Sequence, residues 1–182
     1  MRVCILGNGL SGLTLAKALV NYKIFVDIIP LKKSIQLNKS RTLGISKTNL
    51  EFFNSKITNI DKIIWKLKKI DIFSDNLKNE KLLNFKNKKD QLFSILKNSE
   101  LYNILNKSLK KNKYFKMINI NEKKNSLESY DVVISTDYSS SITKKYFTKQ
   151  ILKKYNSFAH TTIIEHKKII NDTATQIFTK KG

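Results

Sequence analysis

The sequence predicts an α/β fold in which parallel strands alternate with helices, and its first thirty residues carry this prediction. Arg2–Leu6 and Phe25–Ile29 are short apolar runs that contain β-branched residues, as expected of buried strands. Between them, residues 10–22 place apolar side chains such as Leu13 and Ala16 on one helical face. A strand–helix–strand unit of this length joins two parallel strands.

The turn between the first strand and the helix is the most informative segment, because positions 7–12 read GNGLSG. This pattern, placed between a strand and a helix, is typical of Rossmann-like dinucleotide-binding domains. Gly7 permits the tight turn, Gly9 lets a pyrophosphate approach the backbone, and Gly12 lets the helix pack close to the strand. The free N–H groups at the helix start would hold the phosphates. An ordinary strand-to-helix turn is the alternative interpretation.

The end of the second strand departs from the dinucleotide-binding pattern. Such domains carry an aspartate or glutamate there, which binds the ribose hydroxyls. This chain has Pro30 at that position, and proline has no acceptor side chain. Asp27 lies three residues earlier, near the middle of the predicted strand, so we do not assign it to the site.

Further helices and strands are predicted along the chain. Ser46 caps a short helix, and Asn98 or Ser99 caps the clearest helix. That second helix carries an apolar stripe of Leu101, Ile104, Leu105 and Leu109. Residues 131–136 are predicted to form a buried strand. Strand-like composition marks residues 70–73, 82–85, 114–120, 155–165 and 173–179.

The chain is strongly basic, with 35 Lys and Arg residues, 14 acidic residues and a net charge of +21. Such a charge raises the question of nucleic acid or an anionic membrane. Only Arg2 and Arg41 are arginines, although the guanidinium group suits base and phosphate recognition best. Lys, Asn and Ile, whose codons are AT-rich, make up more than 40% of the residues. We therefore expect no specific nucleic-acid partner, and membrane-surface association stays open.

Other functional classes find little support in the sequence. No apolar run is long enough to span a membrane. His160 and His166 lack partners at metal-ligand spacing, so no metal site is predicted. The single cysteine, Cys4, lies inside the first predicted strand and is expected to be buried.

Three segments that follow the glycine turn add a family resemblance. They are residues 40–46 (SRTLGIS), 98–105 (NSELYNIL) and 131–141 (DVVISTDYSSS), and residues 159–165 and 174–182 agree as well. In this order the segments resemble those of the flavin-dependent aromatic hydroxylases of the p-hydroxybenzoate hydroxylase type. Within that family the chain looks most like the ubiquinone-biosynthesis hydroxylases.

The resemblance implies a monooxygenase that binds FAD, takes electrons from NADH or NADPH, and hydroxylates an aromatic or quinone-precursor molecule with O₂. It implies no catalytic side chain. We expect an FAD-binding domain over residues 1–150, with residues 70–97 contributing strands to a β-rich substrate domain that begins within 151–182. We also expect a cytoplasmic location, with a peripheral position at the inner membrane face as an open alternative. The expected cofactor-binding residues are Gly7, Gly9, Leu10, Ser11, Gly12, Arg41, Asn98 and Asp137.

Departures from the family pattern keep two other functions open. Pro30 replaces the ribose-binding acid, and Tyr138 replaces a glycine beside Asp137. Members of the family run to roughly twice this length, so the resemblance implies an N-terminal half. The first alternative is a non-enzymatic remnant of the FAD-binding fold. The second is a basic module that binds nucleic acid or a membrane surface.

Overall fold

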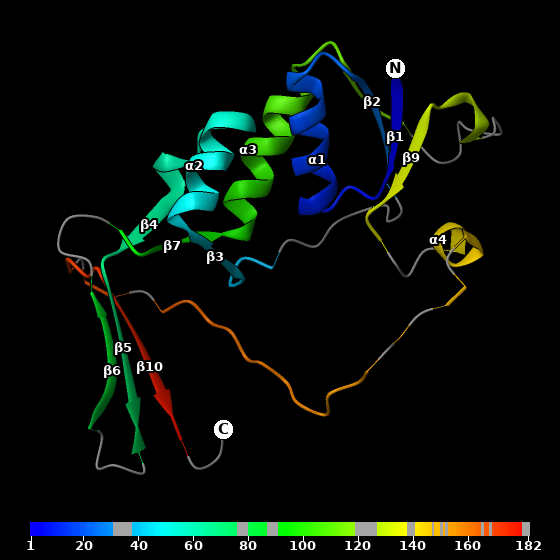
Figure 1. Cartoon of the computed structure of the whole chain (residues 1–182). Helices are drawn as coiled ribbons and strands as arrows, with labels where there is room; N and C mark the ends of the chain where they lie inside the picture. The colour runs from blue at the N-terminus through cyan, green and yellow to red at the C-terminus, as the bar shows by residue number, and fades with distance from the viewer. Residues whose placement is uncertain are drawn as a thin grey trace.

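The computed structural model arranges the chain as three β-sheets with a layer of helices between two of them (Figure 1). The residues that it describes are 1–30, 38–75, 80–86, 91–118, 127–137, 141–146, 148–149, 151, 153–164, 166–167 and 169–179.

The first sheet is parallel throughout and has the strand order β8-β2-β1-β9. Its central strands are β1 (Arg2–Leu6) and β2 (Phe25–Ile29), which confirms both strand predictions. The outer strands are β8 (Phe115–Met117) and β9 (Val132–Ser135). The predicted α/β class with a parallel sheet is therefore confirmed.

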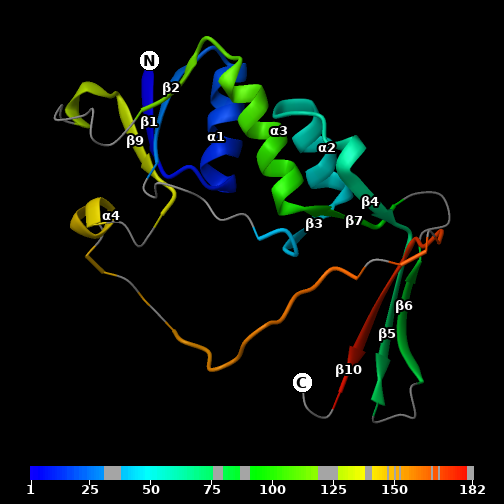
Figure 2. The ribbon, with the colours of Figure 1, turned by 180° about the vertical axis from the view of Figure 1, so that it is seen from behind.

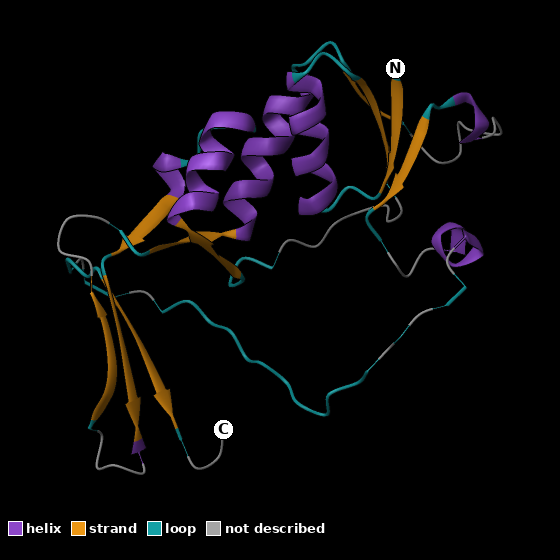
Figure 3. Cartoon of the chain, viewed as in Figure 1, coloured by secondary structure: helices purple, strands orange, loops and turns teal. Residues whose placement is uncertain are grey.

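Three helices form one layer beside this sheet, as Figure 3 shows. They are α1 (Leu10–Asn21), α2 (Lys47–Lys56) and α3 (Asn98–Lys110). Helices α1 and α3 pack against the sheet, and α2 packs against strand β3 (Thr42–Ser46). Side chains from the sheet and from all three helices share one buried core. The prediction that Ser46 caps α2 is confirmed, because the Ser46 hydroxyl accepts a hydrogen bond from the Asn49 amide at 3.3 Å.

The second sheet is antiparallel and lies on the other side of the helix layer, as the view from behind also shows (Figure 2). It has the order β3-β7-β4, formed by β3 (Thr42–Ser46), β7 (Phe93–Lys97) and β4 (Ile64–Leu67). In its register Thr42 pairs with Lys97. This pairing brings the residue before β3 next to the first residue of α3.

The third sheet joins distant parts of the chain in the order β10-β5-β6. It consists of β5 (Lys69–Ser74), β6 (Lys81–Lys86) and β10 (Thr173–Phe178), in agreement with three of the predicted strands. β5 pairs with β6 in antiparallel and with β10 in parallel orientation. The domain boundary near residue 150 stays a prediction. The remaining short elements are η1 (Asp61–Ile63), η4 (Leu127–Ser129) and α4 (Ser141–Tyr146).

Two strand predictions need correction. Residues 155–164 form no strand, because no described segment pairs with their backbone, and residue 165 lies outside the described residues. β9 is a strand, but Val132 and Val133 are 41% and 39% exposed rather than buried. β9 is an edge strand of its sheet, and an edge strand has a neighbour on one side only.

Asp27 lies in the middle of β2, opposite Cys4 of β1, as its sequence position suggested. Its carboxylate is buried and accepts hydrogen bonds from the Arg2 side chain at 2.7 and 3.1 Å and from the Tyr130 hydroxyl at 2.7 Å. These bonds offset the cost of burying the carboxylate. Asp27 is therefore a structural group at the amino-terminal half of the sheet, and Cys4 beside it is buried as expected.

The third sheet holds a carboxylate whose titration can be predicted. The Lys69 ammonium lies 2.8 Å from one Asp71 oxygen, and the Lys81 ammonium lies 3.2 Å from the other. The hydrogen bond from Lys69, with help from Asn84 and Lys81, lowers the pKa of Asp71 from 3.8 to about 2, although desolvation opposes the shift.

We expect the Asp71 carboxyl carbon to titrate with a midpoint near a pH of about 2 in a ¹³C NMR experiment. A pKa lowered by folding means that the carboxylate stabilises the native chain above a pH of about 4, and that this contribution disappears as the pH falls toward 2. Lys69→Met should move the midpoint upward. A midpoint at the ordinary value in the unsubstituted chain would contradict the lysine contacts.

Candidate functional site

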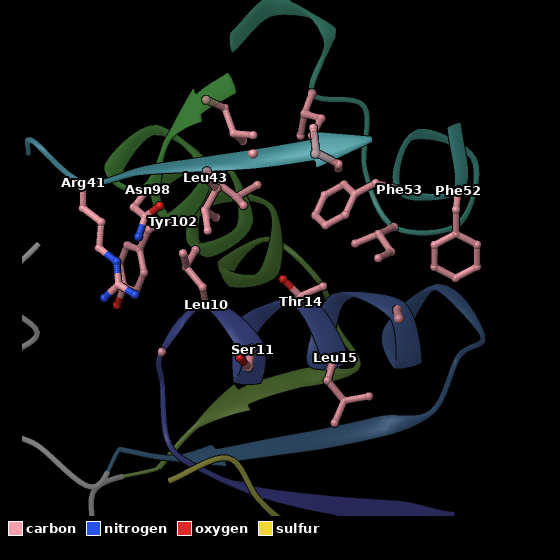
Figure 4. Close-up of a pocket in the computed structure, with 18 of the residues that line it drawn as sticks. Leu10, Ser11, Thr14, Leu15, Arg41, Leu43, Phe52, Phe53, Asn98 and Tyr102 are labelled. Carbon is pink, nitrogen blue, oxygen red and sulfur yellow. The ribbon is translucent and has the colours of Figure 1, made fainter. Parts of the chain in front are cut away.

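A cleft of about 900 Å³ opens between α1, the end of α2, the start of α3 and strand β3. This volume lies within the range of about 300–1,000 Å³ that is usual for small-molecule sites. Figure 4 shows that its two ends differ in character. Arg41, Asn98 and Tyr102 lie together at one end, and Phe52 and Phe53 lie at the other.

The glycine turn has the geometry that the sequence pattern predicts. Gly7 has a φ of +112°, a backbone conformation that favours glycine. A methyl group on Gly7 would lie only 2.6 Å from the Thr136 hydroxyl oxygen, and one on Gly12 would overlap the Gly7 carbonyl oxygen. Both glycines therefore serve the close contact between the helix start, the turn and the end of β9.

Gly9 differs from its two neighbours, because the space beside it is open. A methyl group on Gly9 would meet no atom within 4 Å. Gly9 is the N-cap of α1, it offers no side chain to the helix, and it lines the cleft together with Leu10 and Ser11. The first N–H groups of a helix have no acceptor within the helix, so those of α1 are available to a ligand that approaches this turn.

Arg41 and Asn98 come from different parts of the sequence and meet at the polar end of the cleft (Figure 4). The pairing of β3 with β7 brings the two residues side by side. The backbone N–H of Asn98 donates a hydrogen bond of 3.0 Å to the backbone carbonyl of Arg41. Asn98 is the first residue of α3, and the N-cap is Lys97, without a side-chain hydrogen bond. The prediction that Asn98 or Ser99 caps this helix was therefore wrong.

The Asn98 side chain brings a polar atom without a partner to the wall of the cleft, whereas the similarly unpaired oxygens of Ser94 and Asn106 do not line it. The amide oxygen of Asn98 is buried and has no hydrogen-bond partner among the described residues. Buried polar atoms are nearly always paired, and an unpaired one costs about 1–3 kcal/mol. Because Asn98 lines the cleft, a bound molecule that carries a hydroxyl or N–H group would satisfy this oxygen.

The electrostatics of the cleft favour an anion. Its only charged lining residue among the described part of the chain is Arg41, and no carboxylate lines it. The positive end of the α1 dipole points to the same region. Burial raises the pKa of Tyr102, so its hydroxyl stays protonated at neutral pH and can donate a hydrogen bond.

The structure brings together most of the predicted site residues. Asp137 lies elsewhere: it borders the glycine turn, since its Cβ would be 3.8 Å from a methyl group on Gly7, but it does not line the cleft. Tyr138 lies outside the described residues. The predicted site residues that line the cleft are Gly9, Leu10, Ser11, Arg41 and Asn98. Gly7 and Gly12 shape the glycine turn beside it.

Sequence reasoning missed Tyr102 and Thr14 as lining residues. Tyr102 could have been found, because it follows Asn98 by four residues on the same helix, and such positions share a face. Thr14 follows Leu10 by four residues on α1 and could have been found in the same way.

Neither a candidate metal centre nor a membrane-spanning helix is found in the described residues. They contain no group of three or more potential metal-ligating side chains. No helix among them is long and apolar enough to cross a membrane.

The sequence matches no protein-family model, and no curated protein matches it. Solved structures with a similar fold include FAD-dependent monooxygenases. PqsL, a probable FAD-dependent monooxygenase from Pseudomonas aeruginosa, superposes with a TM-score of 0.62 at 13% identity over 85% of this chain and 48% of its own. A candidate FAD-containing monooxygenase from Photorhabdus luminescens gives 0.60 at 18% identity, over 81% of this chain and 42% of its own.

A third structure is the p-nitrophenol 4-monooxygenase PnpA from Pseudomonas putida, with a TM-score of 0.54 and 13% identity over 64% of this chain. The chain spans 31% to 48% of the length of these three proteins. It therefore shares, over part of their length, the fold of FAD-dependent monooxygenases.

Proposed function

We propose that the cleft binds FAD, and that the chain carries the FAD-binding fold of an aromatic-ring monooxygenase. The observation that carries this proposal is the meeting of three features at one end of the cleft. These features are the open glycine turn at Gly9, the Arg41 guanidinium and the unpaired Asn98 amide oxygen. Together they offer cationic and N–H donors to phosphates, and an acceptor to a hydroxyl or N–H group.

The glycine turn and Arg41 fit FAD, whereas Asp137 does not line the cleft and the end of β2 lacks an acceptor. Gly9 leaves space for a pyrophosphate, and the N–H groups at Leu10 and Ser11 would hold it. Arg41 would bind a phosphate oxygen. The end of β2 does not fit, because Pro30 offers no acceptor for a ribose hydroxyl, and Asp27 is already held by Arg2 and Tyr130.

Bound FAD, reduced by NADH or NADPH, would supply the chemistry that transfers one oxygen atom of O₂ to an electron-rich ring and releases the other as water. The roles of this chain are to bind the cofactor, to orient it and to exclude water from part of it. A phenol or quinone precursor, as in ubiquinone biosynthesis, is the substrate class that we propose. A cytoplasmic site of action belongs to the same proposal.

Purified chain that is mixed with FAD and freed of excess flavin should retain the visible flavin absorption bands. NADH and NADPH oxidation in the presence of candidate phenols then tests the reaction itself. Pro30 favours a second candidate function, a fold remnant that lacks catalysis. A chain that is folded by circular dichroism but retains no flavin would support the remnant and contradict FAD binding.

Arg41 gives a sharper test of the cofactor site. We expect Arg41→Gln to weaken FAD binding by about 10- to 100-fold, as loss of a charge-assisted hydrogen bond to a phosphate would. Lys39→Gln removes the same charge from an exposed neighbour that does not line the cleft, and should change FAD affinity by less than about 2-fold. Equal effects of the two substitutions, measured by fluorescence titration, would show general charge attraction instead.

A further inference from the structure

A second surface lies at the amino ends of the strands of the parallel sheet, whereas the glycine turn of the cleft follows the carboxyl end of β1. The turn from α1 to β2 and the turn from α3 to β8 lie side by side at these amino ends (Figures 1 and 2). The Val26 amide donates a hydrogen bond of 2.8 Å to the Tyr114 carbonyl, and the Phe25 and Tyr114 rings meet edge to face at 5.0 Å. These contacts fix the two turns as one surface.

This surface is both basic and aromatic. The two turns carry the exposed lysines Lys23, Lys111 and Lys113, and β8 carries the exposed Lys116. We call these four lysines, with Tyr22 and Phe25, the basic end. Tyr22 is 67% exposed and Phe25 is 53% exposed. Residues 21–25 and 110–117 contain no acidic residue, and the nearby Asp27 is buried against Arg2 and Tyr130.

Helix capping explains only part of the basic end. A lysine near the carboxyl end of a helix interacts favourably with the helix dipole, which accounts for Lys111 at the end of α3. It does not account for Lys116 on β8 or for the two exposed rings. Lys23 has a φ of +60°, a left-handed conformation at a helix end that ordinarily selects glycine. A strained backbone position that holds a lysine points to a use for its side chain.

We propose that the basic end docks on an anionic phospholipid surface. Lysines attract anionic headgroups as point charges, and exposed aromatic rings with an apolar body settle at the headgroup level of a bilayer. The four exposed cations of the basic end are lysines, and the neighbouring Arg2 is held by Asp27, whereas base recognition in nucleic acids prefers arginine. Charge complementarity calls for an anionic partner, and the lysines and exposed rings favour lipid over nucleic acid.

The placement leaves the cofactor cleft free during docking. The basic end lies at the amino ends of β1, β2 and β8, and Gly9 follows the carboxyl end of β1. The five residues of β1 separate the amino end of the sheet from its carboxyl end by about 13 Å. At about 0.1 M salt this exceeds the screening length of about 10 Å, so docking and FAD binding should be independent.

Vesicle co-sedimentation of the full chain tests the proposal at about 0.1 M salt. Vesicles of phosphatidylcholine with phosphatidylglycerol should bind the chain, and vesicles of phosphatidylcholine alone should not. The triple substitution Lys23→Gln, Lys111→Gln and Lys113→Gln should weaken partitioning by roughly 100-fold, because each lysine near an anionic surface contributes a factor of about 5.

The matched control is the triple substitution Lys62→Gln, Lys66→Gln and Lys68→Gln, which removes the same charge from exposed positions around β4. It should weaken partitioning by less than about 3-fold. Equal losses in the two triple variants, or no binding to anionic vesicles, would overturn the proposal. Duplex DNA that competes through the same three lysines, while vesicles do not bind, would overturn it in favour of nucleic acid.

Lys23→Gly separates the structural role of this position from its binding role. Glycine relieves the left-handed strain, so the variant should unfold at a higher temperature than the original chain. It should nevertheless partition less well, by about 5-fold, onto anionic vesicles. Unchanged partitioning of this folded variant would remove Lys23 from the docking surface.

Discussion

Replacement of Gly12 by alanine will lower the free energy of unfolding by about 2 kcal/mol or more. The new methyl group would overlap the carbonyl oxygen of Gly7, which belongs to the backbone of a turn already held at a φ of +112°. Overpacking of this kind costs about 1–3 kcal/mol, and a clash with backbone lies at the upper end of that range. The gain in helix propensity from alanine, about 1 kcal/mol, is smaller than this cost.

Denaturant unfolding monitored by circular dichroism measures this effect. Gly9→Ala is the matched control, since a methyl group there meets no atom within 4 Å, and it should cost about 1 kcal/mol or less as an N-cap change. If Gly12→Ala were no more destabilising than Gly9→Ala, the tight packing of α1 against the glycine turn would be refuted.

The second large effect is on FAD binding, and here the substitution of Gly9, which the fold tolerates, has the large effect. Gly9→Ala should weaken FAD binding by about 100-fold, because its methyl group would occupy the space through which a pyrophosphate reaches the helix start. The fold tolerates this methyl group, so the loss comes from the ligand side alone.

Fluorescence titration of FAD against the folded Gly9→Ala chain gives the affinity. Thr14→Ala is a useful comparison, because Thr14 also lines the cleft but lies one helical turn beyond Leu10. An affinity for FAD within about 2-fold of the original chain would mean that the phosphates do not approach at Gly9.

Local patterns in the sequence predict the first half of the parallel sheet well. The apolar runs of β1 and β2 and the glycine turn lie within thirty residues, so their pairing needs no long-range information. The glycine geometry at positions 7 and 12 follows for the same reason. A turn of this kind leaves few residue types that fit.

The cleft itself depends on contacts that local patterns do not specify. Arg41 and Asn98 meet because β3 pairs with β7 in a register that places Thr42 opposite Lys97, two residues that lie far apart in the sequence. The family resemblance named both residues, but it did not show that they would line one cleft. Asparagine favours the cap position, which predicts a cap at Asn98, whereas the N-cap of α3 is Lys97, the last residue of β7.

The strand predictions fail where a partner decides the structure. Residues 155–164 have the composition of a strand, but a strand exists only with a paired neighbour, and none of the described segments pairs with them. β9 was expected to be buried because its residues are apolar. Its place at the edge of the sheet leaves Val132 and Val133 partly exposed, and strand order is a property of the whole fold.

The measurement that tests the proposed cofactor site most directly is a ¹H–¹⁵N NMR titration of the chain with FAD. We predict large shifts for the backbone amides of residues 9–12 and for the side-chain amide of Asn98, with no change in the turn that contains Tyr22 and Lys23. Saturable shifts confined to this cleft would support FAD binding at the glycine turn. Unchanged amides at residues 9–12 with excess FAD, in a chain with well-dispersed resonances, would contradict it.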